Sequence, residues 1–431
     1  MRQAPYQIVC LNCKATFEVE EKSPYNFYGC SKCKTDSFVS NLSLELELEE
    51  FKKLQWKELI SNRQGVWRYS ALLPVSPQNQ ISLGEGNTPL LKLERIASEL
   101  NLKELYLKNE CQNPTWSHKD RLVAVSVSKA LELGAQAVTV CTSGNQGAAT
   151  AAYAAKAGLP CVVFTIEWVP QTMKILMQSY GAIVVALSSP EDRVPLMNKC
   201  IGAYGWYPTG NTTNPPYCVG SSYYGVEGCK TIAFEIFEQF SGEIPDVVVV
   251  PTGLGDIIYG IWKGFIELYQ LGLSQTLPRM VAVEPFGPIA NALSKGLTFP
   301  EKVPSRSTPS FSTACNSSTF QGLKAVKDSG GTAIVIEDDR TIMRFQKKLA
   351  QLEGIYGEAA SVTSLAALEQ LLDKEFISNN DRVVCILTST GLKDPASTAQ
   401  YLEPILTLKE PDVDEMIRQV RESYRMELPR G

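Results

Sequence analysis

The chain has 431 residues, 44% of them hydrophobic and 20% charged, with a formal net charge of −5. It is long enough to bury at least one large core, and no long run of lysine and arginine points to a nucleic-acid partner. No stretch of about 18 consecutive apolar residues occurs, and the first residues lack the apolar segment of a signal peptide. We therefore expect a globular cytoplasmic protein without a nucleic-acid or membrane partner.

Four of the twelve cysteines form two CxxC pairs near the N-terminus. Cys10 and Cys13 are followed, after sixteen residues, by Cys30 and Cys33, a spacing that lets four thiolates surround one tetrahedral ion. Four unrelated cysteines are the alternative, but paired CxxC sequences seldom arise by chance. We predict a zinc site, and a structural one, because four thiolates leave no open coordination position for a substrate.

The next segments lead toward one lysine. Residues 43–80 are charged and favour helix, so they are interpreted as a connector. A glycine-rich turn follows at 83–93, and residues 104–110 alternate as a strand does. After Lys119 the spacing predicts a helix that ends at Gly134.

From there strands and helices alternate. A small-residue helix is expected at 148–158 and another helix at 171–180. Strands are predicted from Val/Ile/Ala-rich runs at residues 137–141, 160–165, 182–187, 246–250, 280–284, 333–337 and 382–387. Continuous apolar strands between helices are typical of parallel sheets covered on both faces, so the fold class is α/β.

Lys119, in the string NPTWSHKDR, is a candidate nucleophile. On composition alone it is one of 41 basic residues, and an exposed surface lysine is the simpler interpretation. A lysine reacts with aldehydes when its amine is partly desolvated, so the interpretation as a nucleophile requires a pocket and a carbonyl cofactor. The predicted helix N-terminus favours the neutral amine.

Three turns follow predicted strands, where ligands bind in α/β sheets. PTGLGD (Pro251–Asp256) lies between a strand and a helix, as phosphate loops do, but Ile258 breaks the dinucleotide pattern and no GK[ST] follows, so a monophosphate fits best. SGNQG (Ser143–Gly147) offers glycines and polar donors, although a plain turn would explain it equally well. LTSTGLKD (Leu387–Asp394) offers Thr388 to a ring nitrogen. Together with the lysine, these turns match the aldehyde, phosphate and ring nitrogen of pyridoxal phosphate.

The strings LGEGNTPL, NPTWSHKDR, TSGNQGAATAAYAAKAG, EGCKTIAFEI, PTGLGD and LTSTGLKDP occur in an order that resembles the threonine synthase branch of the fold-type II (tryptophan synthase β-like) pyridoxal phosphate enzymes. The resemblance spans about Leu83 to Pro395 and implies a two-lobed α/β enzyme with an N-terminal zinc ribbon. We expect a homodimer in which residues 1–42 form the zinc-ribbon-like domain, 43–118 and 218–407 the large cofactor domain, 119–217 a small mobile domain, and 408–431 a charged C-terminal helix.

The resemblance also implies roles for single residues. Lys119 would hold the cofactor aldehyde covalently and act as the proton-shuttling base. The other cofactor contacts would be Asn145 to the 3′-oxygen, the backbone of Gly253, Leu254, Gly255 and Asp256 to the phosphate, and Thr388 to the pyridine nitrogen. On the substrate side, Ser143 with Gly144 and Gln146 would meet the carboxylate, and Trp116 would stand beside the substrate. Tyr356 and Glu358 are candidates for the cavity wall, with plain packing as the alternative.

Several positions differ from the family pattern NPTGSFKDR and its neighbours. Trp116 and His118 replace glycine and phenylalanine, Ser389 replaces a glycine, and Gly225 falls where an arginine for the substrate phosphate is expected. His118 either packs or transfers a proton; packing is favoured because a side chain adjacent to Lys119 should point away from the site.

The predicted activity is conversion of O-phosphohomoserine to threonine and phosphate. β-Elimination or β-replacement on a serine or phosphoserine type substrate is the alternative. A scaffold without turnover is a third hypothesis, opposed by the intact lysine and all three turns.

Overall fold

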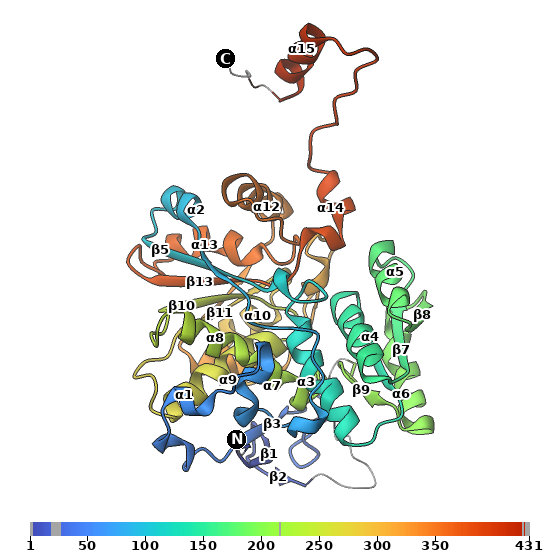
Figure 1. The fold of residues 1–431 in the computed structure, drawn as a ribbon, viewed down its shortest axis with the longest axis vertical. Coiled ribbons are helices and arrows are strands. Elements are labelled where there is room, and N and C mark those ends of the chain that lie inside the picture. Colours follow the sequence, from blue (N-terminus) through green and yellow to red (C-terminus); the bar gives the residue numbers. More distant parts are fainter. Residues whose placement is uncertain (1–2, 19–26, 215–216, 425, 427–431) are drawn as a thin grey trace.

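The computed structural model describes residues 3–18, 27–214, 217–424 and 426, and three β-sheets with surrounding helices make up the fold (Figure 1). Two of the sheets are mainly parallel and flanked by helices. The predicted α/β class is therefore confirmed. Among the described residues, no helix combines the length and the apolar character needed to cross a membrane.

The large sheet has the strand order β12-β11-β10-β13-β5-β4, and every neighbouring pair is parallel except β4 with β5. Its strands are β4 (Leu90–Lys92), β5 (Glu104–Asn109), β10 (Val247–Pro251), β11 (Arg279–Glu284), β12 (Thr332–Val335) and β13 (Arg382–Leu387). The valines of β10 are fully buried: Val248 and Val250 enter one core and Val247 the other. Burial on both faces explains the continuous valine run, since each buried valine contributes about 2 kcal/mol.

A second parallel sheet has the order β8-β7-β6-β9. Its strands are β6 (Val138–Cys141), β7 (Cys161–Ile166), β8 (Ile183–Leu187) and β9 (Tyr207–Pro208), with helices α4 (Asn145–Ala157), α5 (Gln171–Ser179) and α6 (Arg193–Tyr204). Figure 1 shows this green unit beside the large sheet. The predicted strands and helices of this region are confirmed to within a few residues.

Helix α3 (Lys119–Glu132) packs against α4 and against α7 (Tyr223–Cys229). The α3–α7 approach is close: a Cβ at Gly228 would lie 2.0 Å from the carbonyl oxygen of Arg121. Only glycine fits there, and the tight contact fixes the helix whose first residue is Lys119.

The N-terminal sheet is antiparallel, with β1 (Tyr6–Cys10) between β2 (Thr16–Phe17) and β3 (Leu42–Leu46). We call residues 3–18 and 27–46 the ribbon. The prediction of helix from residue 43 is wrong at its start, because leucines at every second position place one face of β3 in the core. Short helices follow it: η1 (Phe51–Lys53), α1 (Trp56–Leu59), η2 (Gly65–Leu72) and η3 (Pro77–Asn79).

The remaining helices cover the large sheet or follow it. They are α2 (Glu94–Glu99), η4 (Glu110–Gln112), η5 (Pro190–Asp192), α8 (Thr231–Gln239), α9 (Asp256–Gln270), α10 (Pro288–Ser294), η6 (Phe311–Thr313), α11 (Phe320–Asp328), α12 (Asp339–Glu353), α13 (Thr363–Asp373), η7 (Gly391–Lys393), α14 (Pro395–Ala399) and α15 (Val413–Tyr424). Helix α15 stands away from the body at the end of an extended segment (Figure 1).

Candidate active site

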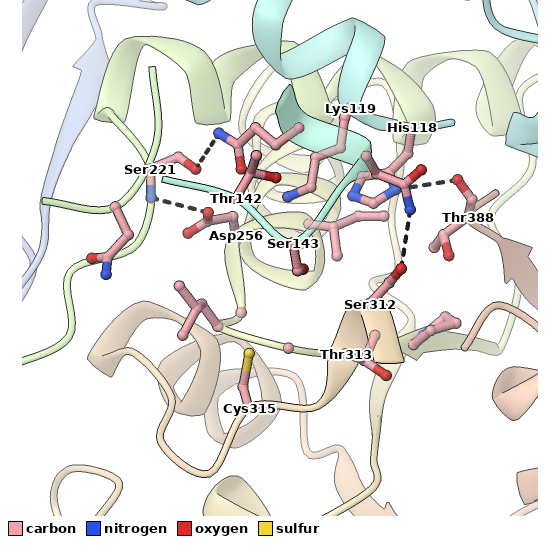
Figure 2. Close-up of a pocket in the computed structure, with 18 of the residues that line it drawn as sticks. His118, Lys119, Thr142, Ser143, Ser221, Asp256, Ser312, Thr313, Cys315 and Thr388 are labelled. Atoms are coloured by element: carbon pink, nitrogen blue, oxygen red, sulfur yellow. Dashed lines mark hydrogen bonds between the residues drawn. The ribbon is translucent and has the colours of Figure 1, made fainter. Parts of the chain in front are cut away.

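A cavity of about 160 Å³ lies where strands β6, β10 and β13 end and their loops meet the N-terminus of α3 (Figure 2). Four sequence-predicted segments meet there. Its lining includes residues from each of these segments: His118, Lys119, Thr142, Ser143, Asn145, Gln146, Gly253, Leu254, Gly255, Asp256 and Thr388. The gathering of these segments at strand carboxyl ends agrees with the position of ligand sites in α/β folds.

Lys119 is half-buried, and its amine has no hydrogen-bond or ion-pair partner among the described residues. In Figure 2 its side chain extends into the cavity. The turn before it is held by Asp120, whose carboxylate accepts from the Thr115 backbone N–H (3.1 Å) and hydroxyl (2.8 Å). Burial raises the pKa of the Asp120 carboxyl to about 6, against the lowering effect of these two bonds. The lysine amine is therefore presented to the cavity from a fixed turn.

The loop Gly253–Asp256 has the features of an anion cradle. The backbone N–H groups of Gly253, Leu254 and Gly255 have no partner among the described residues. The first N–H groups of α9 have no acceptor within the helix, as at any helix N-terminus. Gly255 has φ 104°, and a Cβ there would lie 2.8 Å from the Cα of Gly322.

The Asp256 carboxylate, which a bound dianion would repel, is engaged elsewhere. Its Oδ2 accepts from the Ser221 backbone N–H (3.0 Å), and its Oδ1 accepts from the Gln321 amide (2.8 Å). This arrangement leaves the loop N–H groups free for a phosphate.

Asn145 is the centre of a buried hydrogen-bond network. Its amide nitrogen donates to Glu358 (3.0 Å) and Ser312 (3.2 Å), and its Oδ1 accepts from the Lys393 amine (2.6 Å) and the Ser389 hydroxyl (3.2 Å). Burial lowers the pKa of Lys393 to about 8, although the nearby Glu358 carboxylate opposes the shift. Glu358, predicted as a wall candidate, is therefore bonded directly to a lining residue.

His118 lies in the cavity lining, so the prediction that it points away is wrong. Its Nδ1 lies 3.3 Å from the carbonyl oxygen of Thr388, to which its backbone N–H also donates (2.9 Å). Burial, and then the charge of Lys119, hold the pKa of the imidazole well below its usual 6.5. The prediction failed because the cavity surrounds the end of α3, so two successive side chains there both reach it.

Thr388 also lines the cavity, and its hydroxyl lies 2.8 Å from that of Ser361. Ser361 can rotate its own proton away or toward Thr388, so the threonine hydroxyl can either donate to or accept from a ring nitrogen.

The residues predicted for the substrate divide into two groups. Ser143 and Gln146 line the cavity, and the Gln146 amide donates to the Thr209 carbonyl (2.7 Å) and the Ser221 hydroxyl (3.1 Å). Gly144 and Trp116 are not among the lining residues, and Trp116 is 44% exposed.

Gly225 packs against α3, where a Cβ would lie 3.1 Å from Leu122 and 3.2 Å from Ser126. No arginine is among the described residues that line the cavity. Tyr356 lies outside the lining, and its hydroxyl donates to Thr398 (2.7 Å).

Sequence reasoning missed a loop between α10 and α11. Ser312, Thr313 and Cys315 line the cavity opposite Lys119, as Figure 2 shows. Their stretch is polar and lacks the glycines and flanking strand that marked the other turns. Lys393, in contrast, lies within the LTSTGLKD string, where a basic residue after a predicted ligand turn was a usable signal.

The four cysteines of the ribbon come together. Their sulfur atoms all lie within 4.8 Å of one another, with 3.6 Å between Cys10 and Cys33 and 3.7 Å between Cys13 and Cys30. Thiolates bound to one tetrahedral zinc at about 2.3 Å would be about 3.8 Å apart, so the donor set fits this ion.

Residues 81–389 match the family described as "Pyridoxal-phosphate dependent enzyme". The chain belongs to this family. It is similar to the threonine synthase of Methanosarcina acetivorans, which is 35% identical over 92% of this chain and 95% of its own length. The threonine synthase of Methanocaldococcus jannaschii is 36% identical with the same coverage.

Two solved enzyme structures share the fold of this chain. Maize serine racemase superposes with a TM-score of 0.62 at 23% identity, over 73% of this chain and 91% of that one. Tomato threonine deaminase isoform 2 gives 0.60 at 18% identity, over 75% and 89%. The predicted resemblance to threonine synthase-like fold-type II enzymes is thereby confirmed.

Proposed function

We propose that this pyridoxal-phosphate dependent enzyme converts O-phosphohomoserine to threonine and phosphate. The observation that carries the proposal is the similarity to proteins named threonine synthase over 92% of the chain, at 35% and 36% identity.

Bound pyridoxal phosphate would supply an aldehyde and an electron-withdrawing ring. The N–H groups of Gly253 to Gly255 would hold its phosphate, Thr388 would meet its ring nitrogen, and Asn145 would lie beside its ring oxygen. Lys119 would bind the aldehyde through Nζ and, once released, carry a proton between substrate carbons on the same atom. The Asn145 amide donates to Glu358 and Ser312, so a bond to the ring oxygen would replace one of these two.

The substrate carboxylate is proposed to bind at the N-terminus of α4, where Ser143 and the free N–H groups of the first turn offer donors. Gln146 is held by Thr209 and Ser221, so it fixes that turn rather than moving with the substrate. Trp116 and Gly144 remain predicted substrate neighbours.

One observation favours a second candidate, β-elimination or β-replacement on a serine or phosphoserine type substrate. The position where an arginine is expected for the leaving phosphate is Gly225, which is enclosed by α3. A serine type substrate, whose leaving group carries no phosphate, would not require that arginine.

The experiment compares the purified protein with Lys119→Ala and, as a matched control, exposed Lys156→Ala. We expect visible absorbance from a lysine-bound cofactor, and phosphate and threonine from O-phosphohomoserine, in the wild type and the control only. Cofactor absorbance with turnover of serine or phosphoserine alone would select the second candidate. Protein that shows no such absorbance when supplied with the cofactor would overturn both.

His118→Phe tests the role of the only histidine. Its Nδ1 lies 3.3 Å from the carbonyl oxygen of Thr388, so we expect the ring to pack there and turnover to change little. A fall of about a hundredfold at unchanged cofactor loading, as expected for loss of a general acid or base, would assign it a proton-transfer role.

We also propose a structural zinc ion on Cys10, Cys13, Cys30 and Cys33, a mobile lobe formed by residues 119–217, a homodimer, and a cytoplasmic location. None of the twelve cysteines forms a disulfide in the structure, which supports a reducing compartment. Metal analysis of the purified protein tests the first of these proposals directly.

A further inference from the structure

Helix α15 has an apolar face of which no residue is buried by the described part of the chain. Apolar side chains occupy one stripe of the helix, at the spacing of successive turns: Val413, Met416, Ile417, Val420 and Tyr424. None of the described α15 residues is buried, and Val413 is 69% exposed. A single helix of about 12 residues is marginal in water, so this face requires a partner surface.

A matching surface exists between α12 and α14. It is a groove of about 680 Å³ whose apolar lining includes Met343, Ala350, Pro395, Ala399, Tyr401 and Leu402. Tyr401 and Leu402 are 45% and 56% exposed, so the groove offers apolar area that is open to a ligand of helix size.

The two surfaces carry opposite charge. Arg340, Arg344 and Lys347 project along the α12 side of the groove. Arg344 pairs with Glu369, whereas Arg340 and Lys347 form no ion pair with any described residue. Residues 410–415, at the start of α15, contain four carboxylates and no lysine or arginine.

We propose that α15 of a second copy of this chain occupies the groove, and that the two copies exchange their helices reciprocally. The groove wall includes Pro395, Ala399 and Leu402, and the tail (residues 403–424) begins directly after it. Figure 1 shows the tail running away from this wall, so docking on its own chain would require residues 403–412 to reverse direction. Extended, those ten residues span up to about 33 Å, which is long enough to reach a neighbouring copy.

Reciprocal exchange satisfies closed two-fold symmetry, since each copy gives one helix and receives one. It also pairs the acidic start of each α15 with the basic rim of the other copy's α12. The proposal is independent of the reaction, because it uses no residue of the cavity.

The test is the mass of the full chain by light scattering over a range of protein concentrations. We expect a dimer for the wild type and for Glu422→Gln, which lies on the polar face of α15. Val420→Asp, in the centre of the apolar face, should give a monomer, and Lys347→Glu should weaken the dimer and make it less sensitive to salt. Unchanged melting temperature of the Val420→Asp monomer at low concentration shows that the body is folded.

A mixing experiment separates exchange from docking within one chain. Val420→Asp has an intact groove, and Ala350→Asp has an intact helix, so a mixture of the two monomeric variants should form a dimer with one of the two contacts. A wild-type chain that is monomeric at every concentration overturns the proposal. A dimer that persists in Val420→Asp, or a mixture that stays monomeric, overturns it as well.

Discussion

The two ends of the chain differ in how they relate to the catalytic body. Ribbon residues Ile8, Cys10 and Leu44 belong to the same buried cluster as Val138 and Val140 of β6. Helix α15, at the other end, has no buried residue among those described. The ribbon is thus part of one folded unit with the body, whereas the tail presents a surface to something outside it.

Asn41 shows how far this integration extends. It donates to the carbonyl of Val219 (2.6 Å) and accepts from the N–H of Gln321 (3.1 Å). Gln321 in turn donates to Asp256 at the end of the glycine loop (2.8 Å). The ribbon therefore supports the loop proposed to bind the cofactor phosphate, and the tail has no comparable connection to it among the described contacts.

The largest effect is expected from Cys10→Ser. Removing one of four thiolates should release the zinc, and structural zinc contributes on the order of 10 kcal/mol of folding free energy. We expect a large fall in melting temperature together with loss of bound zinc. Cys200→Ser, outside the cluster, is the control; equal melting of the two variants would show that the ribbon does not depend on metal.

Asn41→Ala should have an intermediate effect. It leaves two buried backbone groups without their partner, which costs about 2 kcal/mol, and it frees Gln321 and hence the loop. We expect weaker binding of pyridoxal phosphate. The measurement is a titration of this cofactor into protein that holds zinc but no cofactor.

Ser43→Ala is the matched control for Asn41→Ala. It removes one hydrogen bond of the ribbon, to the Tyr259 hydroxyl (2.8 Å), and leaves the bonds from Asn41 through Gln321 to Asp256 intact. If both variants bind the cofactor equally, the ribbon stabilises the fold but does not support the loop.

The smallest effect is expected from deleting residues 408–431. At protein concentrations where the chain is monomeric, melting temperature, zinc content and cofactor affinity should match the full chain, because no described α15 residue is buried. A fall in melting temperature under these conditions would show that the tail packs on the rest of its own chain. The tail would then stabilise the fold, as the ribbon does.

Most of the fold could be predicted because its signals are local. The valine run of β10 and the glycine loop after it lie within ten residues of one another, and Lys119 begins a helix with its own spacing. The start of β3 was mistaken for helix because glutamates between leucines favour helix locally, whereas pairing with β1 decides the outcome.

The parts of the site that could not be predicted depend on contacts between distant residues. Ser312 meets Asn145 across 167 positions, and no pattern in a single sequence reports such a pairing. The direction of His118 depends on where the cavity lies relative to the end of α3, which is a property of the assembled fold. The position of Gly225 could be noted from the sequence, but its enclosure by α3 could not.

The bonds of Asn41 also bear on synthesis of the protein. Val219 follows it by 178 residues and Gln321 by 280. At about 5–20 residues per second, the ribbon leaves the ribosome tens of seconds before its last docking partner exists. During that interval its apolar face is exposed, and binding of the proposed zinc ion would stabilise it. Zinc supply during translation would then set the yield of correctly assembled protein.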